Sequence, residues 1–138
     1  MAAREIQKII VHCTATPEGR EVSVNDLHRW HVEERGFSDI GYHWLIDING
    51  TLHECRPEYK AGAHAKGHNK NSIGVCYAGG CDSEMNPKDT RTEAQKETLR
   101  CLLEDLRGRY PQAEILGHRD LSSKACPSFD AKAEYSKI

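Results

Sequence analysis

The sequence predicts an α/β fold in which a mixed central β-sheet carries helices on its faces. Short apolar, β-branched segments alternate along the chain with longer segments of helical period, a pattern typical of sheets covered by helices. The chain has 138 residues, a length that suits one compact domain. No repeat and no Pro/Gly/Ser-rich linker divides it. We therefore expect a single domain over residues 1–138.

The first predicted strand covers residues 8–13, Lys-Ile-Ile-Val-His-Cys. Its short run of apolar, β-branched residues is typical of a buried strand. Residues 14–19, Thr-Ala-Thr-Pro-Glu-Gly, predict a loop by their composition. His12 therefore stands at the end of a buried strand.

A helix is predicted to begin at Ser23, because Ser23 and Asp26 have the spacing of a capping box. Leu27, Trp30 and His31 share one face of this helix. The helix is expected to end at Gly36.

A β-hairpin is predicted around Asn49-Gly50, which separates two strand-like segments at residues 42–47 and 51–55. A further buried strand is predicted at residues 72–78.

A second helix is predicted to begin near Thr92, whose capping-box partner is Gln95. Pro111 ends it. Its apolar residues recur with the helical period and predict a buried stripe of Leu99, Leu102, Leu103, Leu106 and Tyr110.

The last predicted elements are short. Residues 115–117 form a strand that leads into His118. The tail from Pro127 predicts a final helix with proline in its first turn.

Composition excludes several classes of function. The net charge of −2 gives no basic surface of the kind that binds nucleic acid. No run of about 18 apolar residues is present, so no insertion into a membrane is expected. The N-terminal residues lack the apolar core of a secretory signal, so we expect the protein to stay in the cytoplasm until something releases it. The six cysteines form no Cys-x-x-Cys pair, which argues against a zinc knuckle or a dithiol redox motif.

His12, His118 and Cys126 are candidate ligands of a catalytic zinc ion. Both histidines stand at the ends of predicted strands, where α/β proteins often gather their catalytic residues. Three protein ligands leave the fourth tetrahedral position open, and a single thiolate keeps the ion electrophilic enough to activate water. Spacing alone does not select these three, since a lone histidine or cysteine most often has a structural role.

Six sequence motifs, in order along the chain, resemble those of the type 2 N-acetylmuramoyl-L-alanine amidases. This family includes an amidase-type phage lysozyme and the peptidoglycan recognition proteins. The similarity runs from about Ile6 to Tyr135. The motifs are Ile-Val-His-Cys-Thr-Ala-Thr at 10–16, Gly-Tyr-His-Trp at 41–44, Gly-Ala-His-Ala-Lys-Gly at 62–67, Asn-Ser-Ile-Gly-Val at 71–75, Gly-His-Arg-Asp at 117–120 and Lys-Ala-Cys-Pro-Ser-Phe-Asp at 124–130.

The resemblance implies one Zn²⁺ per chain, held by His12, His118 and Cys126 at the floor of a surface groove. It also implies that Tyr42 and Lys124 assist catalysis. The Lys124 ammonium would stabilise the oxyanion formed from the substrate carbonyl. The Tyr42 hydroxyl would orient water or the substrate oxygen. Without the resemblance, Lys124 is a solvated charge and Tyr42 a half-buried hairpin residue.

Substrate contacts are predicted for His64, which lies in a loop flanked by Gly62 and Gly67, and for Asn71. Glycines allow the backbone of such a loop to approach a ligand closely. The alternative for His64 is a mobile surface residue.

The implied reaction is hydrolysis of the amide between N-acetylmuramic acid and L-alanine in bacterial peptidoglycan, by a monomeric phage or prophage endolysin. Such an enzyme stays in the cytoplasm of the host until it is released to the cell wall. Three alternatives remain open. They are a peptidoglycan-binding module without catalysis, a cytoplasmic amidase that recycles wall fragments, and a thiol enzyme with Cys126 as nucleophile and His118 as base.

Overall fold

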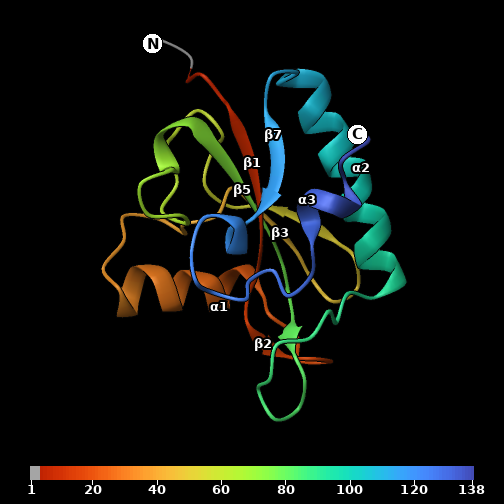
Figure 1. The fold of residues 1–138 in the computed structure, drawn as a ribbon. Coiled ribbons are helices and arrows are strands. Elements are labelled where there is room, and N and C mark those ends of the chain that lie inside the picture. The colour runs from red at the N-terminus through yellow and green to blue at the C-terminus, as the bar shows by residue number, and fades with distance from the viewer. Residues whose placement is uncertain (1–3) are drawn as a thin grey trace.

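The computed structural model describes residues 4–138, and its main sheet has five strands in the order β4-β3-β5-β1-β7 (Figure 1). β4 pairs antiparallel with β3, and the other pairs are parallel, so the predicted fold class with a mixed sheet is confirmed. The prediction about a secretory signal falls partly on residues 1–3, outside the described residues. The strands are β1 (Lys8–Cys13), β3 (Trp44–Ile46), β4 (Leu52–Glu54), β5 (Ser72–Tyr77) and β7 (Glu114–Gly117).

β1 is the centre of the sheet, because β5 pairs with it on one side and β7 on the other. Successive side chains of a strand point to opposite faces. Ile9, Val11 and Cys13 belong to the larger core cluster, whereas His12 points to the other face. The centre of the sheet therefore presents a histidine on the face away from the larger core.

α2 (Glu93–Arg109) covers the face with the larger core cluster (Figure 1). Its predicted start is confirmed, because the Thr92 hydroxyl accepts from the Gln95 amide and the Gln95 side chain accepts from the Thr92 amide. The predicted leucine stripe is buried against Ile9 and Val11.

α1 (Val24–His28) lies on the opposite face of the sheet (Figure 1). Both bonds of the predicted Ser23–Asp26 capping box are present. The helix continues to Glu34 as predicted, but its second half is a π-helical turn, η1 (Arg29–Glu34). Leu27 packs in a second, smaller core cluster with Leu45 of β3.

The predicted hairpin is confirmed, although its strands β3 and β4 are shorter than expected. The Asp47 carboxylate accepts hydrogen bonds from the Asn49 and Thr51 amides and so closes the turn. Tyr42 precedes β3 instead of lying within it.

Two predictions about local structure were wrong. The predicted loop at residues 14–19 contains β2 (Thr16–Pro17), which pairs with β6 (Gly80–Cys81) in a separate small sheet. The final helix, α3 (Ala131–Glu134), does not begin at Pro127 but four residues later. The Asp130 carboxylate caps it by accepting from the Ala133 amide. Two short 3₁₀ turns complete the chain, η2 (Asn69–Asn71) and η3 (His118–Asp120).

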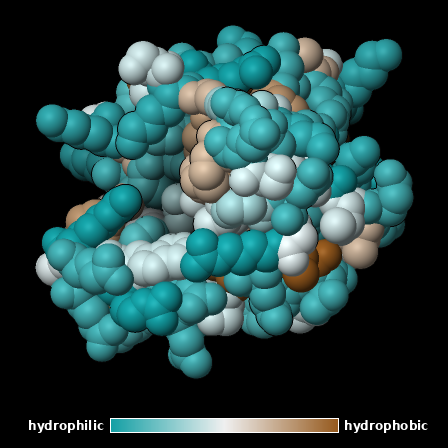
Figure 2. Space-filling model, turned by 90° about the horizontal axis from the view of Figure 1, so that it is seen from below, coloured by the Kyte–Doolittle hydropathy of each residue, from teal (hydrophilic) through white to brown (hydrophobic). Residues whose placement is uncertain are grey.

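The surface seen from below in Figure 2 is mainly hydrophilic, and hydrophobic residues are scattered over it. Within residues 4–138, no helix combines the length and the apolar character needed to cross a bilayer.

Candidate metal centre

Three possible metal ligands meet beside the central strand. His12 is on β1, His118 opens η3 directly after β7, and Cys126 lies in the loop before α3. Because β1 and β7 are parallel neighbours, their last residues reach the same edge of the sheet. One donor atom of each of the three residues lies within 4.8 Å of the other two.

The donor set fits a zinc ion. The Cys126 Sγ lies 3.7 Å from the His12 Nδ1. Zinc bond lengths and a tetrahedral angle give an N···S separation of about 3.6 Å between two ligands. Two imidazoles and one thiol are also donors that zinc prefers.

His64 lies directly behind His12. The Nε2 of His12 is 2.8 Å from the Nδ1 of His64, whose Nε2 is 3.3 Å from the Ser72 hydroxyl. If the Nδ1 of His12 faces the ion, its Nε2 carries the proton and donates to His64. His64 then carries its own proton on Nε2 and donates to Ser72. This chain of hydrogen bonds fixes the tautomer and the orientation of the first ligand.

Two glycines make room for the His64 ring. A Cβ atom on Gly74 of β5 would lie 2.7 Å from the His64 Cδ2 and Cγ, and one on Gly62 would lie 2.6 Å from its Cδ2. The Asn69 carboxamide fixes the loop, because its Oδ1 accepts from the amides of His64 and Ala65. His64 is therefore held from its backbone and packed on both sides.

The histidines of the centre are kept neutral. Burial, followed by the neighbouring His64, His118 and Lys124, lowers the pKa of His12 well below its ordinary value. Burial is also the main cause that lowers the pKa of His64 to about 3 and that of His118 below its usual value. Neutral imidazoles present the free lone pair that metal coordination requires.

Metal coordination requires the histidines to be neutral, but it requires Cys126 to be a thiolate. The Cys13 amide donates to Cys126 Sγ at 3.2 Å. A hydrogen bond with the Cys13 thiol, together with burial, raises the pKa of Cys126 above the ordinary value. A divalent cation would supply the positive charge that a buried thiolate lacks.

Tyr42 is half-buried beside the three donors, with its ring centroid 5.1 Å from that of His12. Its neighbour Gly41 is fixed on both sides, since its amide donates to His31 Nδ1 and its carbonyl accepts from the Ala63 amide. Burial is the main cause that raises the pKa of Tyr42 well above its ordinary value. The hydroxyl therefore stays protonated at neutral pH and can act as a hydrogen-bond donor.

Two adjoining cavities surround the donors, and Ala63, His64, His118 and Lys124 line both. The inner cavity, of about 190 Å³, also contains His12, Cys126, Tyr42 and Arg35. The outer groove has about 630 Å³ and includes Lys66, His68 and Asn69. Of the described residues that line the two cavities, none is acidic. The groove suits an anionic ligand.

The structure brings together all the predicted site residues except Asn71. Lys124 is exposed where the two cavities meet. Asn71 is the last residue of η2 and does not line the cavities; its side-chain Nδ2 donates to the Glu5 carbonyl at 2.7 Å. Its predicted substrate contact stays a prediction. Sequence reasoning missed Asn69 and Arg35, for which neither spacing nor residue type gave a signal.

Comparison with known proteins gives a consistent set of similarities. Residues 2–129 match the family model described as N-acetylmuramoyl-L-alanine amidase. The chain is 42% identical to an endolysin of Klebsiella phage KP32, covering 97% of this chain and 88% of that protein. It is 43% identical to an endolysin of Escherichia phage T7, covering 94% and 85%. Among solved structures, the N-acetylmuramoyl-L-alanine amidase LysC from Clostridium intestinale superposes with a TM-score of 0.80 at 26% identity, covering 95% and 82%.

Proposed function

The chain belongs to the N-acetylmuramoyl-L-alanine amidase family, and from this premise we propose that it is a zinc-dependent amidase of bacterial peptidoglycan. It is an endolysin-type amidase by its similarity to phage endolysins over nearly its whole length. The bond cleaved joins the lactyl group of N-acetylmuramic acid to L-alanine. One observation carries the zinc dependence: two neutral imidazoles and a thiol converge at the floor of a groove.

His12, His118 and Cys126 would hold the ion. When bound, zinc supplies Lewis-acid chemistry, because it polarises a carbonyl and lowers the pKa of water. His64 would keep His12 in the tautomer that presents its Nδ1 to the ion. The 2.8 Å distance between the His12 Nε2 and the His64 Nδ1 supports this role. The predicted contact of His64 with substrate is compatible with this role, since the ring also borders the groove.

Tyr42 and Lys124 are proposed to act on the substrate. The protonated Tyr42 hydroxyl donates a hydrogen bond that orients the reacting oxygen. The Lys124 ammonium, exposed where the two cavities meet, stabilises negative charge as it develops on the carbonyl oxygen. The basic and neutral lining of the groove would attract the carboxylates of the stem peptide.

The proposed setting is that of a phage or prophage endolysin, a monomer that waits in the host cytoplasm and reaches the wall on release. A recycling amidase would act on soluble muropeptides instead. Comparing cleavage of intact sacculi with that of soluble fragments separates the two, because an endolysin must cleave intact sacculi.

The zinc proposal is tested by metal analysis and by mass spectrometry of the products from purified peptidoglycan. We expect one zinc per chain, loss of muramoyl–alanine cleavage on chelation and recovery with Zn²⁺. Cys126→Ser should lose both zinc and cleavage. Cys101→Ser is the matched control, because Cys101 lies exposed on α2 and should leave both unchanged. Full cleavage by the Cys126→Ser variant would contradict the proposal, and binding of sacculi without cleavage by the parent would favour a binding module.

A further inference from the structure

The loop that carries Cys126, residues 121–130, has little regular structure of its own. Its internal hydrogen bonds include the one from the Ser128 amide to the Ala125 carbonyl, and the Arg119 amide donates to the Cys126 carbonyl. Such a loop needs contacts from outside to hold one thiol in a fixed position. Those contacts determine whether Cys126 meets the two histidines.

Besides the bond from the Cys13 amide to Cys126 itself, two hydrogen bonds fasten the rest of the loop to neighbouring strands. The Tyr77 hydroxyl on β5 donates to the Pro127 carbonyl at 2.7 Å, and the Ser128 hydroxyl donates to the Gly80 carbonyl at 2.8 Å. Both anchors act on the two residues that follow Cys126. The next residue, Phe129, is buried in the larger core cluster.

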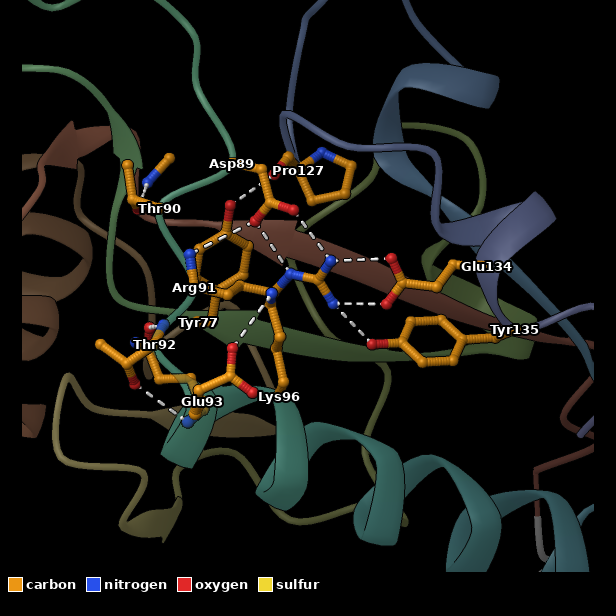
Figure 3. A network of polar contacts seen from close by, with 12 residues as sticks. Tyr77, Asp89, Thr90, Arg91, Thr92, Glu93, Lys96, Pro127, Glu134 and Tyr135 are labelled. Carbon is orange, nitrogen blue, oxygen red and sulfur yellow. Dashed lines mark hydrogen bonds and ion pairs between the residues drawn. The ribbon is translucent and has the colours of Figure 1, made fainter.

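Arg91 lies in a polar cluster just before α2 (Figure 3). Its guanidinium carbon is 3.5 Å from the centre of the Phe129 ring. Its side chain is only 1% exposed, so the charge requires full compensation. All five of its N–H groups have partners in Asp89, Glu134 and the Tyr135 hydroxyl.

The cluster joins three separate parts of the chain. Asp89 precedes α2, Glu134 ends α3, and Phe129 belongs to the Cys126 loop. The hydrogen bonds from Arg91 lower the pKa of Glu134, and they lower the pKa of Asp89 although burial opposes this. Both carboxylates are therefore ionised at neutral pH. Arg91 cannot move away from Phe129 without breaking two bidentate ion pairs.

We propose that Arg91 is a positioning residue for the metal ligand Cys126. Its guanidinium packs on the Phe129 ring. This contact limits the movement of the loop at Cys126, three residues earlier, whose thiol must lie beside His12 and His118. This inference rests on the proposed zinc site. Arg91 lies outside both cavities, yet it would raise the affinity of the site for zinc.

The role requires arginine and not merely a positive charge. A guanidinium is planar, so it stacks on an aromatic ring while its edge bonds two carboxylates. A lysine ammonium is a point charge with three donors, and it cannot reach both carboxylates and cover the ring. Arg91→Lys therefore keeps the positive charge but removes the planar group that stacks on Phe129.

The matched control is Arg100→Lys on α2. Arg100 also bonds two carboxylates, those of Glu97 and Glu104, but its side chain is 48% exposed and belongs to a surface network. Zinc affinity is measured by competition with a chromophoric chelator, at a temperature where circular dichroism shows each variant to be folded. We expect Arg91→Lys to bind zinc roughly 10- to 100-fold more weakly, as for other residues that support metal ligands. Arg100→Lys should match the parent.

A second readout is hydrogen exchange of residues 121–130 in the metal-free protein, which should become faster in Arg91→Lys only. Phe129→Leu keeps the apolar filling but removes the ring, so it should weaken zinc binding to a similar degree. The double variant should lose little more than either single variant, because both act through one contact. If Arg91→Lys does not fold, Phe129→Leu decides the question.

The outcomes separate the two proposals. If the parent takes up no zinc, the proposed function fails. If the parent binds zinc and folded Arg91→Lys binds it equally well with unchanged exchange in the loop, the positioning role is overturned, even when the variant is less stable. Unchanged zinc affinity in Phe129→Leu would overturn it as well.

Discussion

Gly74→Ala is expected to disturb the proposed metal centre, although Gly74 is not one of its proposed ligands. The added Cβ would lie 2.7 to 2.8 Å from three atoms of the His64 ring. That ring cannot retreat easily, because it is bonded to His12 and Ser72 and Gly62 packs on it as well. The ring must turn or the strand must shift, and either movement weakens the hydrogen bond to His12.

The expected change in the free energy of unfolding follows from two opposing effects. Overpacking of a buried site costs about 1–3 kcal/mol. Replacing glycine by alanine also restricts the unfolded chain, which stabilises the fold by about 0.4–1 kcal/mol. The net expectation is a loss of about 1–2 kcal/mol in the free energy of unfolding of the metal-free protein. Loss of the bond that orients His12 should weaken zinc binding about tenfold.

Urea unfolding in the presence of chelator measures the change in stability, and competition for zinc measures the change in zinc affinity. Gly108→Ala is the control, since Gly108 lies within α2 and a Cβ there would meet nothing within 4 Å. Alanine in a helix is favoured over glycine by about 0.5–1 kcal/mol, so this variant should be more stable than the parent. The reasoning is refuted if Gly74→Ala is as stable as the parent and binds zinc equally well.

Three further predictions concern the stability of the metal-free protein, measured by urea unfolding in the presence of chelator. Burial lowers the pKa of His43 to about 4, so below pH 6.5 the unfolded chain takes up a proton that the folded chain refuses, and stability falls as the pH is lowered. The loss from His43 alone is roughly 2 kcal/mol at pH 5, and a flat profile between pH 7 and 5 would contradict it. Tyr77→Phe leaves the buried Pro127 carbonyl without its donor and should cost about 1–2 kcal/mol; no loss would mean that another donor replaces it. Thr92→Ala removes the cap that accepts from Gln95 and should cost about 1 kcal/mol, whereas an unchanged midpoint would show that the cap contributes nothing.

Local signals predicted the parts of the fold that depend on local chemistry. Both capping boxes, at Ser23 and Thr92, form as expected because a side chain and an amide three residues apart need no distant partner. The π-helical turn after His28 and the pairing of β2 with β6 were not predictable in this way. Each depends on what the rest of the chain packs against it. The tail helix was misplaced because Asp130 is a better cap than Pro127 is a first-turn residue.

The candidate site shows the same division. The resemblance selected His12, His118 and Cys126, and the three side chains do lie together, while their role as ligands remains a proposal. The contact between His12 and His64 could not be read from the sequence, because it depends on a glycine in β5, a strand that neither histidine belongs to. The five-fold bonding of Arg91 joins segments more than forty residues apart and leaves no periodic pattern.

The three donors also have a consequence for the chain as a whole. His12 and Cys126 are separated by 114 residues, so one ion would tie the first strand of the sheet to the last loop. It would work as a reversible cross-link that closes a very long loop and restrains the opening of both ends of the sequence at once. Ligand that binds only the folded chain adds RT ln(1 + [L]/Kd) to its stability, about 4 kcal/mol at a thousandfold excess over Kd. For the proposed zinc protein, chelation should therefore also affect the fold: limited proteolysis should begin to cleave residues 121–130 and residues 4–7 together.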